Sequence, residues 1–172
     1  MEPGKLMAKI IPVIHDVSSA QRLIDMARTV YALGADILVA TRVYGAAAQN
    51  GVPEATRIAL KLGKSFVALP ELRDAVELFT PDTILVVSSE YGERLPAGKM
   101  RELVQGKTML VFGGSDPGLS RQDIAVGRAI YFEGVEGRLS PVAEAALILY
   151  TLQVSGKTED EKSPRDGPTV QA

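Results

Sequence analysis

The chain of 172 residues contains no cysteine, no tryptophan and a single histidine, His15. Without cysteine there are no disulfides or thiolate metal sites, and one histidine excludes a metal site built from several imidazoles. Aromatic residues make up only 5% of the chain, which leaves few platforms on which unpaired bases could stack. No run reaches the roughly 18 apolar residues that a membrane span requires, and the first residues lack a secretory signal pattern. We therefore expect a cytoplasmic protein that makes no membrane contact.

The chain also lacks a large excess of either charge, because it has 19 basic and 21 acidic residues and a net charge of −2. This balance excludes a uniformly basic, nucleic-acid-coating surface. The distribution is uneven, however: residues 1–64 carry eight Lys or Arg against five Asp or Glu, and residues 65–155 carry eight against twelve. A local basic face is therefore predicted in the first third, from Arg22, Arg28, Arg42, Arg57, Lys61 and Lys64.

What the sequence does contain is a regular alternation of short apolar runs and amphipathic segments. Six apolar runs predict buried strands over residues 9–14, 36–41, 65–69, 83–88, 108–112 and 128–133. Helices are predicted over residues 18–33, 53–62, 70–79, 96–105, 120–126 and 141–154. This order predicts a single α/β domain over residues 1–155, a mostly parallel six-stranded sheet with helices on both faces. Residues 156–172, rich in charge, are predicted to form a disordered tail.

Three loops that follow predicted strands are the candidate binding segments: residues 89–92, 113–118 and 134–140. Ligands of an open parallel sheet bind at the carboxyl ends of its strands, and glycine in these loops lets a ligand approach the backbone closely. A tight turn that happens to contain glycine is the alternative for each loop. Neither the phosphate loop of nucleoside triphosphatases nor the dinucleotide-binding glycine pattern is present.

Acidic residues near the predicted strand ends offer a second kind of chemistry. Together they could hold Mg²⁺, as nuclease sites do; the set is Asp16, Glu90, Asp116 and either Glu133 or Glu136. The D…E-x-K spacing of many nucleases cannot be traced here. A serine hydrolase is excluded because the G-x-S-x-G motif is missing and no nucleophile pairs with a base. We interpret His15 as a structural residue of the first loop.

Three motifs point together to a known family. Residues 137–150 (GRLSPVAEAALILY) form a loop leading into an apolar, Ala-rich helix, residues 113–119 read GGSDPGL, and residues 28–34 read RTVYALG. In these motifs the chain resembles the SPOUT superfamily of RNA methyltransferases, over residues 9–154. The resemblance implies an α/β fold with a C-terminal trefoil knot and a homodimer formed through the last helix. It also implies transfer of a methyl group from S-adenosylmethionine to tRNA or rRNA, with the ribose 2′-oxygen as one candidate acceptor.

The same resemblance implies which residues form the site, and it implies no metal. The residues that it implies for cofactor binding are Ser88, Ser89, Gly113, Gly114, Ser115, Gly118, Phe132, Gly134, Leu139, Ser140 and Ala143. Arg28 is the implied catalytic residue, which would stabilise an alkoxide by hydrogen bonding. Where SpoU-type enzymes carry asparagine or an Asn-Glu pair, this chain has Arg22, Gly114-Ser115 and Leu139. A base-methylating relative, a non-catalytic knotted protein that binds RNA or protein, and a Mg²⁺-dependent nuclease therefore stay open as alternatives.

Overall fold

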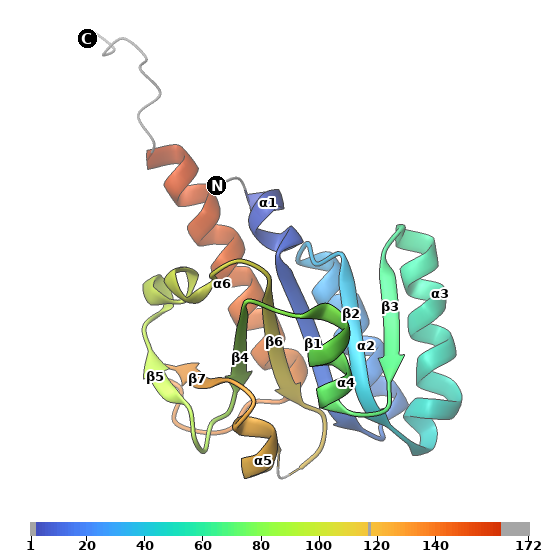
Figure 1. Ribbon diagram of the computed structural model, residues 1–172. Coiled ribbons are helices and arrows are strands. Elements are labelled where there is room, and N and C mark those ends of the chain that lie inside the picture. The colour runs from blue at the N-terminus through green and yellow to red at the C-terminus, as the bar shows by residue number, and fades with distance from the viewer. Residues whose placement is uncertain (1–2, 117, 163–172) are drawn as a thin grey trace, which may run out of the picture.

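The computed structural model describes the backbone of residues 3–116 and 118–162 and the side chains of residues 4–116 and 118–155. Seven parallel strands form one sheet in the order β3-β2-β1-β6-β4-β7-β5 (Figure 1). They are β1 Ile10–Val17, β2 Ile37–Val43, β3 Ser65–Leu69, β4 Thr83–Val87, β5 Glu93–Leu95, β6 Thr108–Gly113 and β7 Arg128–Phe132. The predicted α/β class with a parallel sheet is confirmed, and β5 is a short edge strand that the sequence did not predict.

Six α-helices accompany the sheet in the described residues: α1 Pro3–Ala8, α2 Ala20–Ala32, α3 Val52–Leu62, α4 Leu72–Phe79, α5 Arg121–Ile124 and α6 Pro141–Lys162. The helix predicted over residues 96–105 is wrong, because this stretch forms two short 3₁₀ turns, Ala97–Lys99 and Arg101–Leu103. Gly98 in the first turn weakens a regular helix there. Helix α6 runs seven residues into the segment expected to be a tail, and residues 163–172 lie outside the described part.

Both faces of the sheet are covered, as the near-continuous apolar strands require. Ile10 and Ile14 of β1 belong to the core shared with α1, α2 and α6. The alternating residues Ile11 and Val13 belong to a second, smaller core shared with α4. In Figure 1, α4 lies in front of the sheet, and α2 and α6 lie behind it. Two hydrophobic layers therefore hold the strand ends in fixed positions.

Strand order gives the C-terminal half an unusual connectivity. The chain forms β4 and β5 first, returns so that β6 lies between β1 and β4, and then places β7 on the far side of β4. The trefoil knot expected from the resemblance stays a prediction. Among the described helices, none combines the length and the apolar character needed to cross a lipid bilayer.

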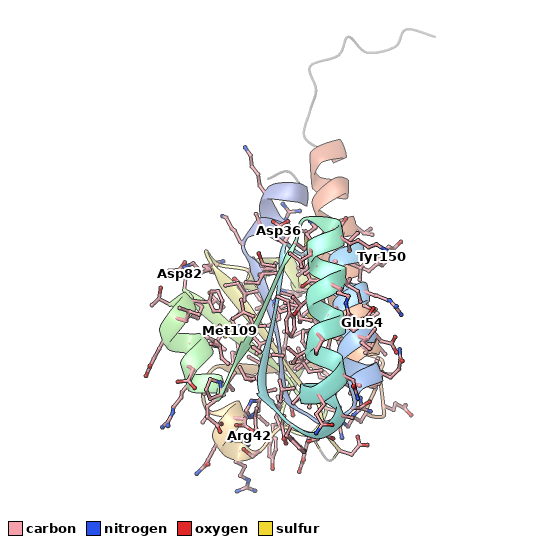
Figure 2. All side chains as sticks on the ribbon, turned by 90° about the vertical axis from the view of Figure 1, so that its right-hand side faces the viewer. Asp36, Arg42, Glu54, Asp82, Met109 and Tyr150 are labelled. Atoms are coloured by element: carbon pink, nitrogen blue, oxygen red, sulfur yellow. The ribbon has the colours of Figure 1, made fainter. Side chains whose placement is uncertain are left out.

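Because every strand runs in the same direction, all carboxyl ends meet along one side of the sheet, which we call the carboxyl edge. Helix α5 lies at this edge, at the bottom of Figure 1. Figure 2 shows Arg42, at the end of β2, at this edge and Asp36, just before β2, at the opposite one. The loops singled out from the sequence therefore gather at one place.

Candidate functional site

A cavity of about 270 Å³ opens at the carboxyl edge, and we call it the strand-end cavity. Two loops form its walls, the one that follows β4 and the one that follows β6, together with one residue of the β7–α6 loop and one residue of α6. The lining residues are Val87, Ser88, Ser89, Glu90, Gly113, Gly118, Leu119, Arg138 and Glu144. Polar and charged groups from four separate segments thus converge on one small space.

Glu144, in the first turns of α6, is the most perturbed group of the cavity. Its side chain is almost completely buried, and burial raises the pKa of its carboxyl to about 7. A hydrogen bond from the Tyr131 hydroxyl and the positive charge of Arg138 act in the opposite direction and favour the carboxylate. A carboxyl group poised between its two protonation states near neutral pH, in a cavity, suits a general base or acid.

Arg138 supplies the positive charge beside this carboxyl. Its Nη2 donates to the carbonyl of Ser115 at 2.7 Å, and its Nη1 lies 3.1 Å from Oδ1 of Asp116. The guanidinium lies over Gly118, where a Cβ atom would stand 3.4 Å from Cζ of Arg138. The φ angle of Gly118 is also +104°. Glycine therefore suits this position because it tolerates positive φ and because it leaves room for the guanidinium of Arg138.

The wall formed by the β4 loop is fixed by a second arginine. The guanidinium of Arg94 lies 4.9 Å from the centre of the Tyr131 ring, and its Nη1 donates to the carbonyls of Ser89 at 2.7 Å and Gly92 at 3.1 Å. Tyr131 in turn accepts a hydrogen bond from the amide of Leu139 at 2.9 Å. One aromatic side chain therefore connects the β4 loop, the β7–α6 loop and the buried carboxyl.

A second polar cluster lies further along the edge, around His15. The ring of His15 is fully buried, with Nδ1 2.7 Å from Oγ1 of Thr41 and Nε2 3.4 Å from Oδ1 of Asp123 but without a hydrogen bond. Burial lowers the pKa of His15 below 6.5, although Asp123 acts to raise it. His15 is therefore neutral at pH 7 and connects β1, β2 and α5, in keeping with its structural interpretation.

The residues expected to bind a cofactor are distributed over several places. Ser88, Ser89, Gly113 and Gly118 line the strand-end cavity, whereas Phe132 and Gly134 line a separate hollow of about 220 Å³ beside α6. The others serve local contacts: Gly114 O accepts from Arg22, Ser115 donates to Asp16, Leu139 N donates to Tyr131, and Ala143 N donates to Ser140. Pro117, in the middle of the expected motif, lies outside the described residues.

Arg28, the expected catalytic residue, does not line this cavity. It lies on α2 and lines a hollow of about 580 Å³ between α2 and α3, together with Glu54 and Arg57. Arg28 is eight residues from Ala20 at the start of α2, which places it roughly 12 Å along the helix from the carboxyl edge. The structure therefore separates Arg28 from the cavity.

The carboxylates expected to hold Mg²⁺ are also separated. Asp16 accepts a hydrogen bond from Ser115 at 2.9 Å, Asp116 pairs with Arg138, and Glu133 lines the hollow beside α6. Among the side chains that the structure describes, residues 4–116 and 118–155, no group of three or more His, Cys, Asp or Glu is placed to hold a metal ion. Glu90 and Glu144 share the strand-end cavity, and two carboxylates do not make a preformed metal centre.

Sequence reasoning missed the role of Glu144 and of its partner Tyr131. One signal was present: Glu144 is a lone acidic residue in the otherwise apolar stretch 141–150. A carboxyl group kept in such a helix is rarely buried unless it is paired or functional.

Known proteins resemble this chain in two different ways, in sequence and in fold. The likeness in sequence points to nucleases. Residues 45–151 match the family described as RecB-family nuclease (DUF2122). The protein of Aeropyrum pernix named "Putative type II restriction enzyme ApeKORF2002P" is 53% identical over 148 residues, which cover 86% of this chain and 95% of that protein. A protein of Methanocaldococcus jannaschii with the same description, MjaORF1200P, is 26% identical over 85% of this chain and 97% of its own length.

The second likeness is one of fold. A protein from Haemophilus influenzae described as "a probable methylase family protein" superposes with a TM-score of 0.74 at 16% identity, over 95% of this chain and 73% of its own. The SpoU methyltransferase AviRb from Streptomyces viridochromogenes superposes with a TM-score of 0.69 at 18% identity, over 88% of this chain and 62% of its own. At these identities the likeness establishes the SPOUT-like fold and nothing about activity.

These findings correct the functional prediction drawn from the sequence. The resemblance to SPOUT methyltransferases is right for the fold and wrong for the activity, because the family and the sequence relatives carry nuclease descriptions. S-adenosylmethionine as cofactor and methyl transfer as reaction are both overturned with it. The physical reason is that the motifs which suggested them, a glycine-rich loop and two segments of helix, describe the backbone and packing of the fold and not the side chains that perform chemistry.

Proposed function

Since this chain belongs to the family of RecB-family nucleases (DUF2122), we propose that it hydrolyses phosphodiester bonds of nucleic acid in the strand-end cavity. The observation that carries this proposal is the buried carboxyl of Glu144, with a pKa of about 7, in a cavity that also contains the guanidinium of Arg138. A base poised near neutral pH and a fixed positive charge are the two groups that attack of water on a phosphodiester needs.

Each side chain has a definite part in this reaction. The carboxylate of Glu144 takes a proton from a water molecule as the water oxygen forms a bond to phosphorus. The bond from phosphorus to the leaving sugar oxygen breaks, and the protonated carboxyl returns the proton to that oxygen. Arg138 pairs with the non-bridging phosphate oxygens, whose negative charge increases as the water oxygen attacks.

No step of this proposal passes through a metal ion, because the described carboxylates form no three-ligand centre. Mg²⁺ is often held by one or two carboxylates together with the substrate phosphates, so Glu90 and Glu144 could bind Mg²⁺ once a substrate phosphate is present. Cleavage of labelled DNA and RNA strands is therefore followed both in EDTA and in Mg²⁺.

The test compares the wild-type chain with Glu144→Gln and with the matched control Glu136→Gln, which makes the same chemical change at an exposed position outside the cavity. We expect Glu144→Gln to reduce cleavage by about 10²- to 10⁴-fold, the usual contribution of a general base. The control should cleave at the wild-type rate. Equal rates for all three proteins would contradict the assignment of Glu144.

A non-catalytic nucleic-acid-binding protein is the second candidate function. The separated carboxylates support it, because the described part of the chain contains no acidic cluster of the kind common in nucleases. Binding of nucleic acid without cleavage by the wild-type protein, under every metal condition, would decide for this alternative.

Self-association through the last helix stays a prediction. Helix α6 exposes the apolar residues Leu147, Tyr150 and Val154, spaced three and four apart on one face. Sedimentation velocity of the full chain over a range of concentrations measures whether this face pairs with a second copy.

A further inference from the structure

Few aromatic side chains are exposed on this protein, and two of them lie at the carboxyl edge. Tyr44 follows β2, Tyr91 lies in the loop after β4, and Tyr150 lies on α6; all three are at least 40% exposed. Tyr91 directly follows Glu90, which lines the strand-end cavity. Tyr91 therefore places an exposed aromatic ring beside the cavity, where a bound ligand could contact it.

The loop that carries Tyr91 is held rigidly. The amide of Tyr91 donates to Oγ of Ser88 at 3.1 Å, and the amide of Gly92 donates to the carbonyl of Ser88 at 2.9 Å. Arg94 holds the carbonyls of Ser89 and Gly92 from the other side. An exposed ring on a fixed loop loses little conformational entropy when it binds a ligand.

Arg121, at the start of α5, accompanies the ring. Its guanidinium carbon lies 5.8 Å from the ring centre, and its Nε donates to the Tyr91 hydroxyl at 3.3 Å. The guanidinium thus lies over one face of the ring and also contacts its hydroxyl. Arg121 follows Leu119, a cavity residue, by two positions, so the pair Tyr91–Arg121 joins the two loops that form the cavity walls.

We propose that Tyr91 and Arg121 form a subsite for one unpaired nucleotide beside the strand-end cavity, so that the substrate is single-stranded nucleic acid. The base stacks on the ring of Tyr91, and the adjacent phosphate pairs with Arg121. Stacking on aromatic rings next to arginine is how single strands are held without regard to sequence. A paired base inside a duplex cannot offer its face to the ring. This inference rests on the proposed nuclease function, because it names the substrate class of the same site.

The experiment measures binding separately from cleavage. Fluorescence anisotropy of labelled oligonucleotides is recorded with the full chain carrying Glu144→Gln, in EDTA, so that the strand is not consumed. The probes are a single-stranded DNA, a single-stranded RNA and a DNA duplex of the same length. We expect both single strands to bind more tightly than the duplex.

Three substitutions are compared in this background. Tyr91→Ala should weaken single-strand binding about 5- to 150-fold, the loss that corresponds to one base–aromatic stack, whereas Tyr91→Phe should bind within about twofold because the ring remains. Arg121→Gln should weaken binding and reduce the slope of log affinity against log salt by about one. Leu60→Ala, which shortens an exposed side chain on α3, is the control and should change nothing.

The outcomes separate this inference from the function on which it rests. Unchanged single-strand affinity in Tyr91→Ala, or tighter binding of the duplex than of the single strands, would overturn the subsite while cleavage by the wild-type protein upholds the nuclease. Failure of every probe to bind, together with no cleavage, would overturn the nuclease itself. Thermal melting of each variant confirms that it is folded.

Discussion

Replacing Glu144 by glutamine should make this protein more stable at alkaline pH. The folded-state pKa of about 7 lies above the ordinary glutamate value of 4.5 because the carboxyl is buried. Between these two values the folded protein holds a proton that the unfolded chain has released. Stability supplied by this proton is complete below about pH 4.5 and is lost as pH rises through about 7.

The size of the effect follows from the two pKa values. Each pKa unit corresponds to about 1.4 kcal/mol, so the wild-type protein loses about 3 kcal/mol of unfolding free energy from this one group by pH 8. A neutral glutamine carries no charge to bury and avoids this loss. For a chain of this size, 3 kcal/mol corresponds to an increase of roughly 6 to 12 °C in the melting temperature.

Urea denaturation at pH 4.5, 6, 7 and 8 measures the difference between Glu144→Gln and the wild-type protein. We expect the two to be nearly equal at pH 4.5 and the variant to gain stability progressively toward pH 8. Glu136→Gln, at an exposed position, should follow the wild-type curve throughout. A variant that is destabilised by the same amount at every pH would refute the reasoning, since the carboxyl would then act through packing and not through its charge.

Three further predictions concern the surroundings of the site. Tyr131→Phe removes a hydrogen bond that favours the carboxylate at the start of α6, so the pH midpoint of activity should move upward in a pH–rate profile. Gly92→Ala should destabilise the protein by about 1–3 kcal/mol, because its Cβ would overlap backbone atoms of β7 and of its own loop; Gly98→Ala, with open space around it, should be nearly neutral in the same melting experiment. Asp123→Asn removes an interaction that raises the pKa of His15, so an NMR titration of this single histidine should show a lower pKa in the variant.

The sequence was sufficient for the sheet because its strands are buried on both faces. All six predicted strands are present, and the run 65–69 matches β3 residue for residue. Helix α2 begins at Ala20, two residues after its predicted start, because Ser19 caps it: the Ser19 side chain accepts a hydrogen bond from the amide of Arg22. The edge strand β5 was not, because three residues such as Glu93–Leu95 carry no periodic pattern.

The site was less accessible to sequence reasoning, because it depends on contacts between distant segments. Ser115 donates to Asp16 across 99 positions of the chain, and Arg22, the residue that replaces a family asparagine, holds the carbonyl of Gly114 instead. The burial of Glu144, and therefore its pKa, depends on how α6 packs behind the loops of β4 and β6. Spacing along the chain carries none of this information.

The pH dependence of strand cleavage tests the central claim most directly. Single-turnover rates of the wild-type protein on a labelled single strand, measured from pH 5 to pH 9, should rise about tenfold per pH unit up to about pH 7 and then level off, as a base with this pKa requires. In Glu144→Gln the residual rate should lose this rise. A wild-type profile without an inflection near pH 7, or the same profile in both proteins, would contradict the claim that Glu144 is the base of a nuclease.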